Sequence, residues 1–465
     1  MAEPMLRAVT IALLGICAAA ANAQDAASPV DFTLRPSQDS ATPVDNADSD
    51  LWSFDDTPLK PRIPAPIPAL LPEAAGPRPG KPVRRLDDDD AFAPVGVQLG
   101  TFIIRPSLDV GVQATDNADG GSGKDRAVGL LVAPAVSIES NWSRHSVQVE
   151  AAGTAVQYGD RSTNVREGYA RAKGRFDINR DTALDAEAGY ALDLDTYTDP
   201  DTPSAAAERP ANHTFTAGAG ATHRFNRVSV RVGGEAARET HDAVRLAGGG
   251  TESRGDLDYT RYGLRVRTEI QAGPAFTPYV EGAGGQKHFD ETVDSSGYRR
   301  SGNWGELTGG LLIDLGEKTK GEVSLGYYRE SPDDRRLKDL SGLLANAALM
   351  WSPRRLTTIK LDLSTSVDPT SIAGASGSFV YSGTLSVVHQ LNARLTMEAG
   401  VGIDYQRYVG ADLRQTVYSG FAGASYALNR TAALQARYTH ERTDGSGPGS
   451  DGDENIVTLR LRLQR

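Results

Sequence analysis

The sequence predicts an all-β fold: a single transmembrane antiparallel barrel of about eighteen strands, preceded by a disordered proline-rich arm. Three observations predict it. Short runs of alternating apolar and polar residues recur from residue 95 to the C-terminus, and the connections between them alternate between short and long. No apolar stretch reaches the roughly 18–20 residues that a membrane-spanning helix needs. The predicted domains are a signal peptide (1–23), an arm (24–94) and the barrel (95–465).

The N-terminus has the three parts of a secretory signal peptide. Arg7 precedes an apolar run over residues 8–21, and the tripeptide Ala-Asn-Ala at 21–23 matches a cleavage site. The only cysteine, Cys17, lies inside the apolar run. A chain cleaved after residue 23 therefore has no cysteine, which excludes disulfides, thiolate metal ligands and a cysteine nucleophile.

Residues 24–94 differ in composition from the rest of the chain. Thirteen of the 25 prolines fall there, together with an acidic block at 87–90. Such a segment cannot supply a sheet ladder and has too few apolar residues to bury, so we predict a disordered, partly polyproline arm in the periplasm. Trp52 and Phe54 form its one apolar cluster, which is either a docking point for a partner or a loosely packed surface patch.

From residue 95 onward the sequence shows the period-two pattern of strands with one wet face and one apolar face. In the last run, Val457, Leu459 and Leu461 alternate with polar residues. Each run has about the length of a tilted strand that crosses a bilayer. The predicted strands are 102–115, 127–138, 145–158, 165–176, 182–196, 213–225, 228–238, 259–270, 276–289, 303–315, 320–329, 340–351, 358–367, 380–390, 395–405, 416–428, 433–442 and 454–463.

The connections support a barrel of the outer-membrane type. Few-residue turns alternate with longer polar stretches, such as 197–212, 239–258 and 368–379. Outer-membrane barrels have short periplasmic turns and long external loops on opposite ends. An even strand count then places both termini in the periplasm, so the predicted location is the outer membrane of a Gram-negative bacterium.

Aromatic residues near the strand ends predict two interfacial girdles, as outer-membrane barrels have. The residues beside the short turns are Trp142, Phe176, Phe225 and Trp351. The residues near the long loops are Tyr158, Tyr197, Trp304, Tyr405 and Tyr418.

The first predicted strand carries a resemblance to a known family. Residues 94–102 (PVGVQLGTF), 106–108 (PSL) and 115–117 (TDN) resemble the opening of a β-barrel porin family that includes outer-membrane proteins associated with exopolysaccharide export. The resemblance covers about residues 94–465 by pattern. It implies an outer-membrane pore, with a secreted polysaccharide as one expected cargo, and brings no catalytic residues. The chain departs from many such barrels because it ends in Leu-Gln-Arg rather than in an aromatic residue.

Motifs for catalysis or cofactor binding are missing from the sequence. It contains no H-E-x-x-H, G-x-S-x-G, Walker loop or Cys/His cluster, so we expect neither an enzyme nor a cofactor or metal site. Asp199 and Asp201, like Asp333 and Asp334, have the oxygen ligands that calcium prefers. A solvated acidic loop explains these residues as well, and we favour that interpretation.

Charged residues on the polar phase of the strands are the candidate pore lining. Neighbouring strands of opposite sign suggest cross-strand pairing, and a charged lumen either orients polar solutes and ions or is simply solvated. Arg231, Arg261, Arg265 and Arg267 form a second basic stripe, and we expect Glu235, Glu269 and Glu281 to meet it. The last three arginines of the stripe should make the wall locally positive. The predicted pore-lining residues are Arg171, Lys173, Arg175, Asp185, Glu187, Asp193, Asp195, Arg231, Glu235, Arg261, Arg265, Arg267, Arg460 and Arg462.

The predicted function is an outer-membrane pore for passage of polar solutes or for export of a secreted polysaccharide. The alternative is a surface, adhesive or structural barrel that does not transport, and an outer-membrane enzyme is the less favoured third class. The expected partners are outer-membrane lipids, lipopolysaccharide and the outer-membrane assembly machinery. The arm is a candidate docking segment for periplasmic polysaccharide-export components, and no nucleic-acid partner is expected.

Overall fold

The computed structural model describes residues 92, 94–118, 126–159, 164–203, 205–446 and 450–465. The predicted signal peptide, Cys17, and the arm residues Trp52 and Phe54 lie outside the described residues, so these predictions stay open. No helix in the described part of the chain has the length and apolar character that would be needed to cross a membrane.

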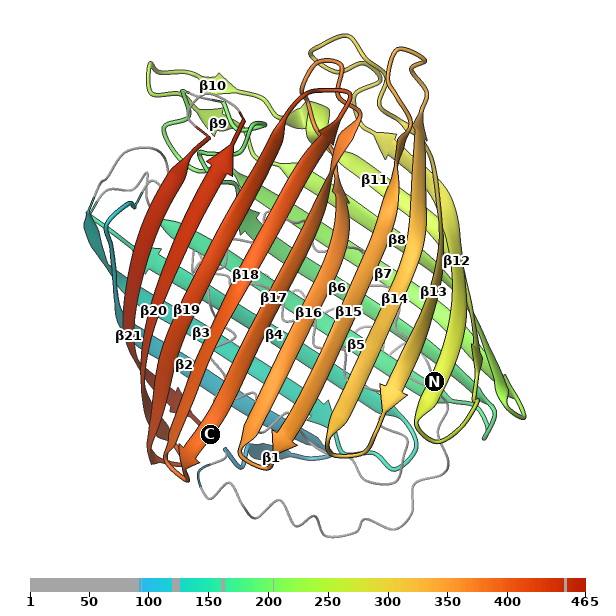
Figure 1. The fold of residues 1–465 in the computed structure, drawn as a ribbon, viewed down its shortest axis with the longest axis vertical. Coiled ribbons are helices and arrows are strands. Elements are labelled where there is room, and N and C mark those ends of the chain that lie inside the picture. The colour runs from blue at the N-terminus through green and yellow to red at the C-terminus, as the bar shows by residue number, and fades with distance from the viewer. Residues whose placement is uncertain (1–91, 93, 119–125, 160–163, 204, 447–449) are drawn as a thin grey trace.

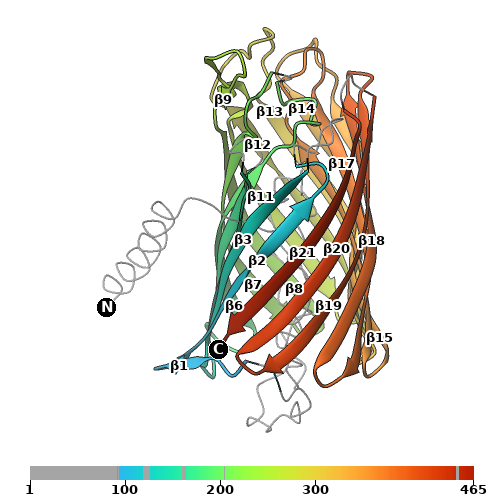
Figure 2. The same ribbon diagram turned by 90° about the vertical axis from the view of Figure 1, so that its left-hand side faces the viewer.

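The chain forms one closed antiparallel barrel of 18 strands, as predicted (Figures 1 and 2). Most predicted strand ends lie within three residues of the observed ones. The barrel strands are β2 (Phe102–Thr115), β3 (Ala127–Ser140), β4 (Ser146–Gln157), β5 (Val165–Asp177), β6 (Thr182–Leu194), β7 (Ala211–Phe225), β8 (Val228–His241), β11 (Tyr259–Ile270), β12 (Phe276–Phe289), β13 (Gly302–Asp314), β14 (Thr319–Pro332), β15 (Leu340–Arg354), β16 (Thr357–Asp368), β17 (Gly377–Asn392), β18 (Leu395–Val409), β19 (Arg414–Asn429), β20 (Ala432–Gly445) and β21 (Gly452–Gln464).

The ring closes where the first barrel strand, β2, pairs with the last, β21. At the loop end of this seam, the Asp116 carboxylate accepts hydrogen bonds from the Asn455 backbone N–H at 2.7 Å and from its side-chain amide at 2.8 Å. The Asn117 amide donates to the Asp453 carbonyl oxygen at 3.0 Å. The Thr-Asp-Asn segment of the opening motif therefore joins the two ends of the sheet.

The alternating pattern places apolar side chains on the outside and polar side chains inside. On β14, Leu325 faces outward with 72% of its surface exposed, whereas its neighbour Ser324 is buried inside the barrel. On β21, Leu459 and Leu461 point out, and Arg460 and Arg462 are buried inside. This inside-out arrangement suits a barrel that is surrounded by lipid and contains water.

Short turns gather at one end of the barrel and long loops at the other (Figure 1). The β7–β8 turn has two residues, and Asn226 adopts a left-handed φ of 60°, as tight hairpins require. The connection from β8 to β11 is long and contains the small hairpin β9 (Val244–Arg245) and β10 (Thr251–Glu252), followed by the 3-10 turn η2 (Gly255–Leu257). Before the barrel, β1 (Val97–Leu99) folds back on the start of β2 at the short-turn end.

The predicted girdle of aromatics is correct at the short turns and only partly correct at the long loops. Trp142, Phe176, Phe225 and Trp351 are exposed beside the short turns, and Tyr418 is exposed near the long-loop end. Tyr158 and Trp304 are buried inside the barrel instead. The girdle was predicted from position along the strand, but the alternation of side chains decides whether a residue points out or in. Trp304 lies two residues from Glu306, so both point to the polar, inner face of β13.

Candidate functional site

The candidate site is the interior of the barrel, where charged side chains from neighbouring strands meet. The basic residues of β5 lie opposite the carboxylates of β6. Lys173 is paired in register with Glu187, and Arg175 with Asp185. Asp185 also forms an ion pair with Arg231 of β8, across β7. Gly220 of β7 leaves room for that contact, because a Cβ there would lie 3.0 Å from Arg231 Nη2 and 3.2 Å from Asp185 Oδ2.

The predicted arginine stripe on β11 is the centre of a dense set of ion pairs. Arg265 donates to Glu235 at 3.0 Å, to Glu281 at 2.5 Å and to Glu306 at 2.7 Å. Both charge signs are therefore present at the same depth. We call this set, completed by Arg267, Glu269 and Glu322, the arginine lattice.

Arg267 has as many partners as Arg265. It donates to Glu269 at 2.9 Å and to Glu322 at 3.0 Å, and its guanidinium lies 3.5 Å from the centre of the Tyr279 ring. Only 2% of Arg267 is exposed. The carboxylates predicted to meet this stripe, Glu235, Glu269 and Glu281, contact the two arginines. Glu306 of β13 and Glu322 of β14 are further counterions that the sequence did not single out.

Arg261, the third member of the predicted stripe, contacts aromatic rings. Its guanidinium lies 3.6 Å from the centre of the Trp304 ring, within a cation–π geometry. Trp304 belongs to a cluster with Tyr328, Leu340, Leu344 and Phe379, and Phe379 has 0% exposure. These rings are covered, so they stabilise this side of the barrel and offer no open stacking surface. An aromatic residue on the polar phase of a strand was the sequence signal for this cluster.

Arg460 and Arg462 hold the closing seam. Arg462 binds both carboxylate oxygens of Asp109 at 2.8 Å, and Arg460 lies 3.4 Å from the same carboxylate. Asp109 is 1% exposed. A bidentate arginine–carboxylate contact of this kind fixes the register of β21 against β2.

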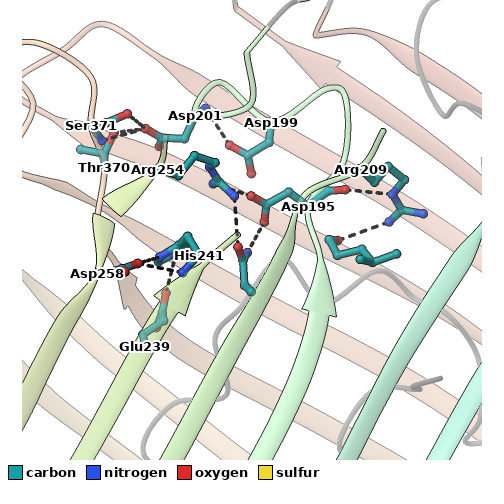
Figure 3. Close-up of polar contacts among 12 residues, drawn as sticks. Asp195, Asp199, Asp201, Arg209, Glu239, His241, Arg254, Asp258, Thr370 and Ser371 are labelled. Carbon is teal, nitrogen blue, oxygen red and sulfur yellow. Dashed lines mark hydrogen bonds and ion pairs between the residues drawn. The ribbon is translucent and has the colours of Figure 1, made fainter. Parts of the chain in front are cut away.

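The β6–β7 connection extends from the barrel wall over the long-loop end, and we call it the crossbar (residues 195–203 and 205–210). Its root is anchored by two arginines (Figure 3). Arg209 donates to the Asp195 carbonyl oxygen at 2.8 Å, and Arg254 lies 2.5 Å from the Asp195 carboxylate. Arg254 also donates to Asn212 at 3.1 Å, which ties the β8–β11 connection to the same point.

The tip of the crossbar docks on the β16–β17 connection. The Asp201 carboxylate accepts hydrogen bonds from the Thr370 hydroxyl at 2.9 Å and from the Ser371 backbone N–H and hydroxyl at 2.8 and 3.0 Å (Figure 3). Gln415 of β19 donates to the Thr198 carbonyl oxygen at 3.0 Å. Burial raises the pKa of Asp201 above its ordinary value, although the hydrogen bonds from Ser371 and Thr370 oppose this shift.

The two connections joined by Asp201 lie on opposite sides of the ring. Between β7 and β16 stand β8 and β11 to β15, and between β6 and β17 stand β2 to β5 and β18 to β21. The crossbar therefore spans the mouth of the barrel. The sequence predicted a long loop at 197–212, but it carried no signal that this loop crosses the lumen.

The β16–β17 connection, which Asp201 contacts, is itself hydrogen-bonded to a neighbouring loop. Arg300, from the β12–β13 connection, donates to the carbonyl oxygens of Ala375 at 2.6 Å and Ile372 at 3.0 Å. The same arginine is ion-paired with Asp294 at 2.5 Å. The tip of the crossbar therefore contacts a loop that Arg300 stabilises through hydrogen bonds.

Calcium ligation by the Asp-rich loops has no geometric support among the described residues. Asp201 is engaged by Thr370 and Ser371, and Asp334 pairs with Arg336 at 2.7 Å. Across the part of the chain that the structure describes, no three His, Cys, Asp or Glu side chains converge as a metal site would require.

Comparison with known families gives one match that covers most of the chain. The family model described as Putative beta-barrel porin 2 matches residues 90–465. No curated protein matches the sequence.

Solved structures with a similar arrangement of strands are remote in sequence. The copper transporter OprC has 10% identity and a TM-score of 0.43, with 80% of this chain and 81% of that chain covered. The siderophore receptor PiuA from Acinetobacter baumannii has 11% identity and a TM-score of 0.42, with 80% and 82% covered. The outer membrane protein OpdK from Pseudomonas aeruginosa has 13% identity and a TM-score of 0.39, with 78% and 98% covered.

Proposed function

Because the chain belongs to the Putative beta-barrel porin 2 family, we propose that it forms a diffusion pore for small polar solutes in the bacterial outer membrane. One observation carries the proposal: a closed barrel of 18 strands has a charged inner wall. Barrels of about 16–18 strands are wide enough to leave an aqueous channel. A wall of paired charges keeps such a channel wet and polar.

The crossbar supports passage of small solutes more than export of a polysaccharide. It is fixed at its root through Asp195 and at its tip through Asp201. A polymer chain passing through the mouth must go beside it or displace it. A secreted polysaccharide is therefore the second proposed cargo, and a polymer too wide to pass beside the crossbar would have to break the Asp201 contacts.

We assign the short turns and both chain ends to the periplasm, and the long loops to the cell exterior. Phe92 packs against Ala427 and Ala433 at the short-turn end, with the Arg394 guanidinium 5.0 Å from its ring centre. Phe92, a described residue at the end of the predicted arm, therefore lies at the short-turn end. We propose the arm as a docking segment for periplasmic export components. Outer-membrane lipids and lipopolysaccharide would contact the apolar outer face.

Thiol labelling tests this orientation. A cysteine introduced at Gly248, in the β8–β11 connection, should react with a membrane-impermeant reagent on intact cells. A cysteine at Asn226 should react only after the outer membrane has been opened. Cys17→Ser serves as the background, and the reverse labelling pattern would invert the barrel.

Planar-bilayer recording of the refolded protein tests the pore itself. We expect stable channel currents from protein that runs as a folded, heat-modifiable band, and uncharged polymers of increasing size should show the width that the crossbar leaves. Folded protein that carries no current would contradict the pore and favour a surface or structural role. Faster passage of a charged polysaccharide than of small solutes would support export.

A further inference from the structure

We propose that the barrel wall has a lateral gate between β15 and β16, through which small apolar and amphiphilic solutes pass between the lumen and the outer leaflet of the membrane. The inference rests on the proposed function, because the gate branches from the same pore. Three observations carry it. The two strands lose their backbone pairing toward the long loops, side chains close the wall there, and most of those side chains are apolar.

The backbone pairing between β15 and β16, neighbouring strands in Figure 1, stops well before either strand ends. Toward the long loops, its last pair is Ala347 with Leu363. β15 extends beyond it to Leu340 and β16 to Asp368, and these two strand ends, both among the described residues, are not paired with each other. The ladder has six residue pairs, whereas the closing seam between β2 and β21 has nine. Part of the wall at this seam therefore lacks a backbone ladder.

Side chains join the two strands where the ladder stops. The Ala345 N–H donates to the Thr365 hydroxyl at 3.0 Å, and this hydroxyl lies 3.1 Å from the Ala345 carbonyl oxygen, to which it donates. The Thr365 N–H donates to the side-chain oxygen of Asn346 at 3.0 Å. In a regular antiparallel pair the backbone groups would bond to each other. Here they are connected through side chains.

Beyond this point, the ring of Phe379 closes the wall. It packs against Leu340 and Leu344 of β15 and is fully buried. It also lies over Gly342, where an added Cβ would be 2.8 Å from the ring's Cζ. Phe379 belongs to β17, which is separated from β15 by β16 in the ring of strands. The side chain therefore reaches past β16 to fill the seam, and separating the strands here breaks side-chain contacts rather than a ladder.

The seam lies at the depth of the outer membrane interface. Leu343 is exposed on the outer face of β15 and is paired with Tyr327, which is exposed as well. Leu363 is exposed on the outer face of β16. Exposed aromatic residues of this kind mark the edge of the apolar band in outer-membrane barrels. With the long loops outside, as we assign them, an opening at this seam leads into the outer leaflet.

The side chains on the lumen side of the seam are also largely apolar. Tyr328 and Trp304, on the inner faces of β14 and β13, belong to the same cluster as Phe379 and Leu344. A hydrated ion or a sugar would lose hydrogen bonds to water against these rings without replacing them. An apolar molecule, or the apolar tail of an amphiphile, is stabilised by the same contacts, while a polar head group stays in the wet lumen. Apolar and amphiphilic solutes are therefore the class that fits this route.

The crossbar restrains the β16 side of the seam. Asp201 at its tip binds the β16–β17 connection through Thr370 and Ser371. In the same connection, the Ser376 hydroxyl donates to the carbonyl oxygen of Lys338, just before β15, at 2.6 Å. The first contact holds the connection to the crossbar, and the second holds it to the β15 side. Opening the gate therefore requires the Ser376–Lys338 contact to break, and the crossbar limits how far the connection can move.

Uptake by intact cells tests the gate. N-phenylnaphthylamine, an uncharged aromatic probe that fluoresces in lipid, reports the lateral route, and a small sugar reports the pore. Phe379→Ala removes the ring that closes the seam. The rate of probe uptake should therefore rise several-fold over that of the wild type, while sugar uptake changes little.

The matched control is Phe421→Ala. Phe421 is also buried and also lies over a glycine, Gly400 of the neighbouring strand. Unlike Phe379, it stands in a wall that is paired on both sides, with Gly400 on β18 and Thr439 on β20. This variant should keep the wild-type rate of probe uptake. If either alanine variant does not fold, Phe379→Leu and Phe421→Leu make the same comparison.

A disulfide across the seam tests the gate in the closed direction. The pair is Ala345→Cys with Thr365→Cys, in the Cys17→Ser background. The Thr365 hydroxyl lies within 3.1 Å of the Ala345 backbone, so two sulfurs at these positions are within bonding reach. In the oxidised protein, probe uptake should fall below the wild-type rate, and reduction should restore it. Sugar uptake should be the same in both states.

The outcomes separate the two proposals. Folded wild-type protein that passes neither current nor sugar would overturn the pore. Sugar uptake together with probe uptake that the disulfide leaves unchanged would overturn the gate and leave the pore intact, even if Phe379→Ala raises probe uptake, because a hole made by the substitution needs no gate. Probe uptake that rises in Phe379→Ala, stays at the wild-type rate in Phe421→Ala and falls with the disulfide would support the gate.

Discussion

The two halves of the inner wall contain the same kinds of charged residue but arrange them differently. In the arginine lattice, Arg265 and Arg267 each contact several carboxylates at hydrogen-bonding distance. Near the long loops, Asp368 of β16 is 6% exposed, and its Oδ2 accepts no hydrogen bond from a described residue. Paired charges mainly fix structure, whereas unpaired ones create a field that solutes can feel. The difference shows that a count of charged residues does not tell which of them have a counterion.

The largest effect should come from opening the arginine lattice. Arg267→Gln leaves Glu269 and Glu322 without their common partner, and breaking such a buried pair costs about 3–5 kcal/mol. The urea midpoint of the barrel in lipid should fall accordingly. Asp368→Asn should leave the midpoint unchanged or raise it, since it removes an uncompensated charge. Equal losses in the two variants would remove the distinction between the halves.

Two adjacent residues of β16 that point to opposite faces of the barrel wall test which face is the inner one. Leu361 is on the apolar phase and Lys360, its neighbour, is buried inside. Leu361→Arg should cost about 2–4 kcal/mol if it lies near the bilayer midplane. Lys360→Arg, which keeps the charge inside, should change the midpoint little. The same urea titration measures both, and similar losses would mean that the facing is wrong.

A smaller effect is expected from undocking the crossbar. Asp201→Ala removes the acceptor of three hydrogen bonds from Thr370 and Ser371. Hydrogen bonds to a charged group contribute about 1.5–3 kcal/mol each before the loop's regained entropy offsets part of the loss. Single-channel conductance and current noise should both increase. Asp242→Ala, in the next long connection, should resemble the wild type, and an unaltered Asp201→Ala channel would mean that the crossbar does not limit flow.

The smallest expected effect is a pH dependence of the crossbar. Burial holds the pKa of Asp201 above its ordinary value when the tip is docked, so docking takes up a proton relative to the released loop. The contribution to docking is fully present below the ordinary pKa of an aspartate and is lost as pH rises through the raised one. Current noise should therefore decrease as pH falls from neutral toward about 4. The Asp201→Asn channel should lack this component.

Several parts of the site could be found from the sequence because they depend on local pattern. The parity of β11 placed Arg261, Arg265 and Arg267 on one face, and they do share the polar phase of that strand. The Thr115-Asp116-Asn117 segment was noticed as a motif, although its role at the seam depends on Asn455, far along the chain. Glu235, Glu269 and Glu281 were predicted as counterions of these arginines, whereas Glu306 and Glu322 were not, because they lie on strands farther around the ring.

The sequence by itself determined the strands, the turns, the two faces of the wall and the outer-membrane type of barrel, because period-two patterning and turn chemistry act over a few residues. Only the closed ring decided which charges meet. Arg265 reaches Glu306 two strands away, and the crossbar finds Thr370 across the mouth. Such contacts depend on the register of every hairpin and on the diameter of the ring, which no single segment encodes.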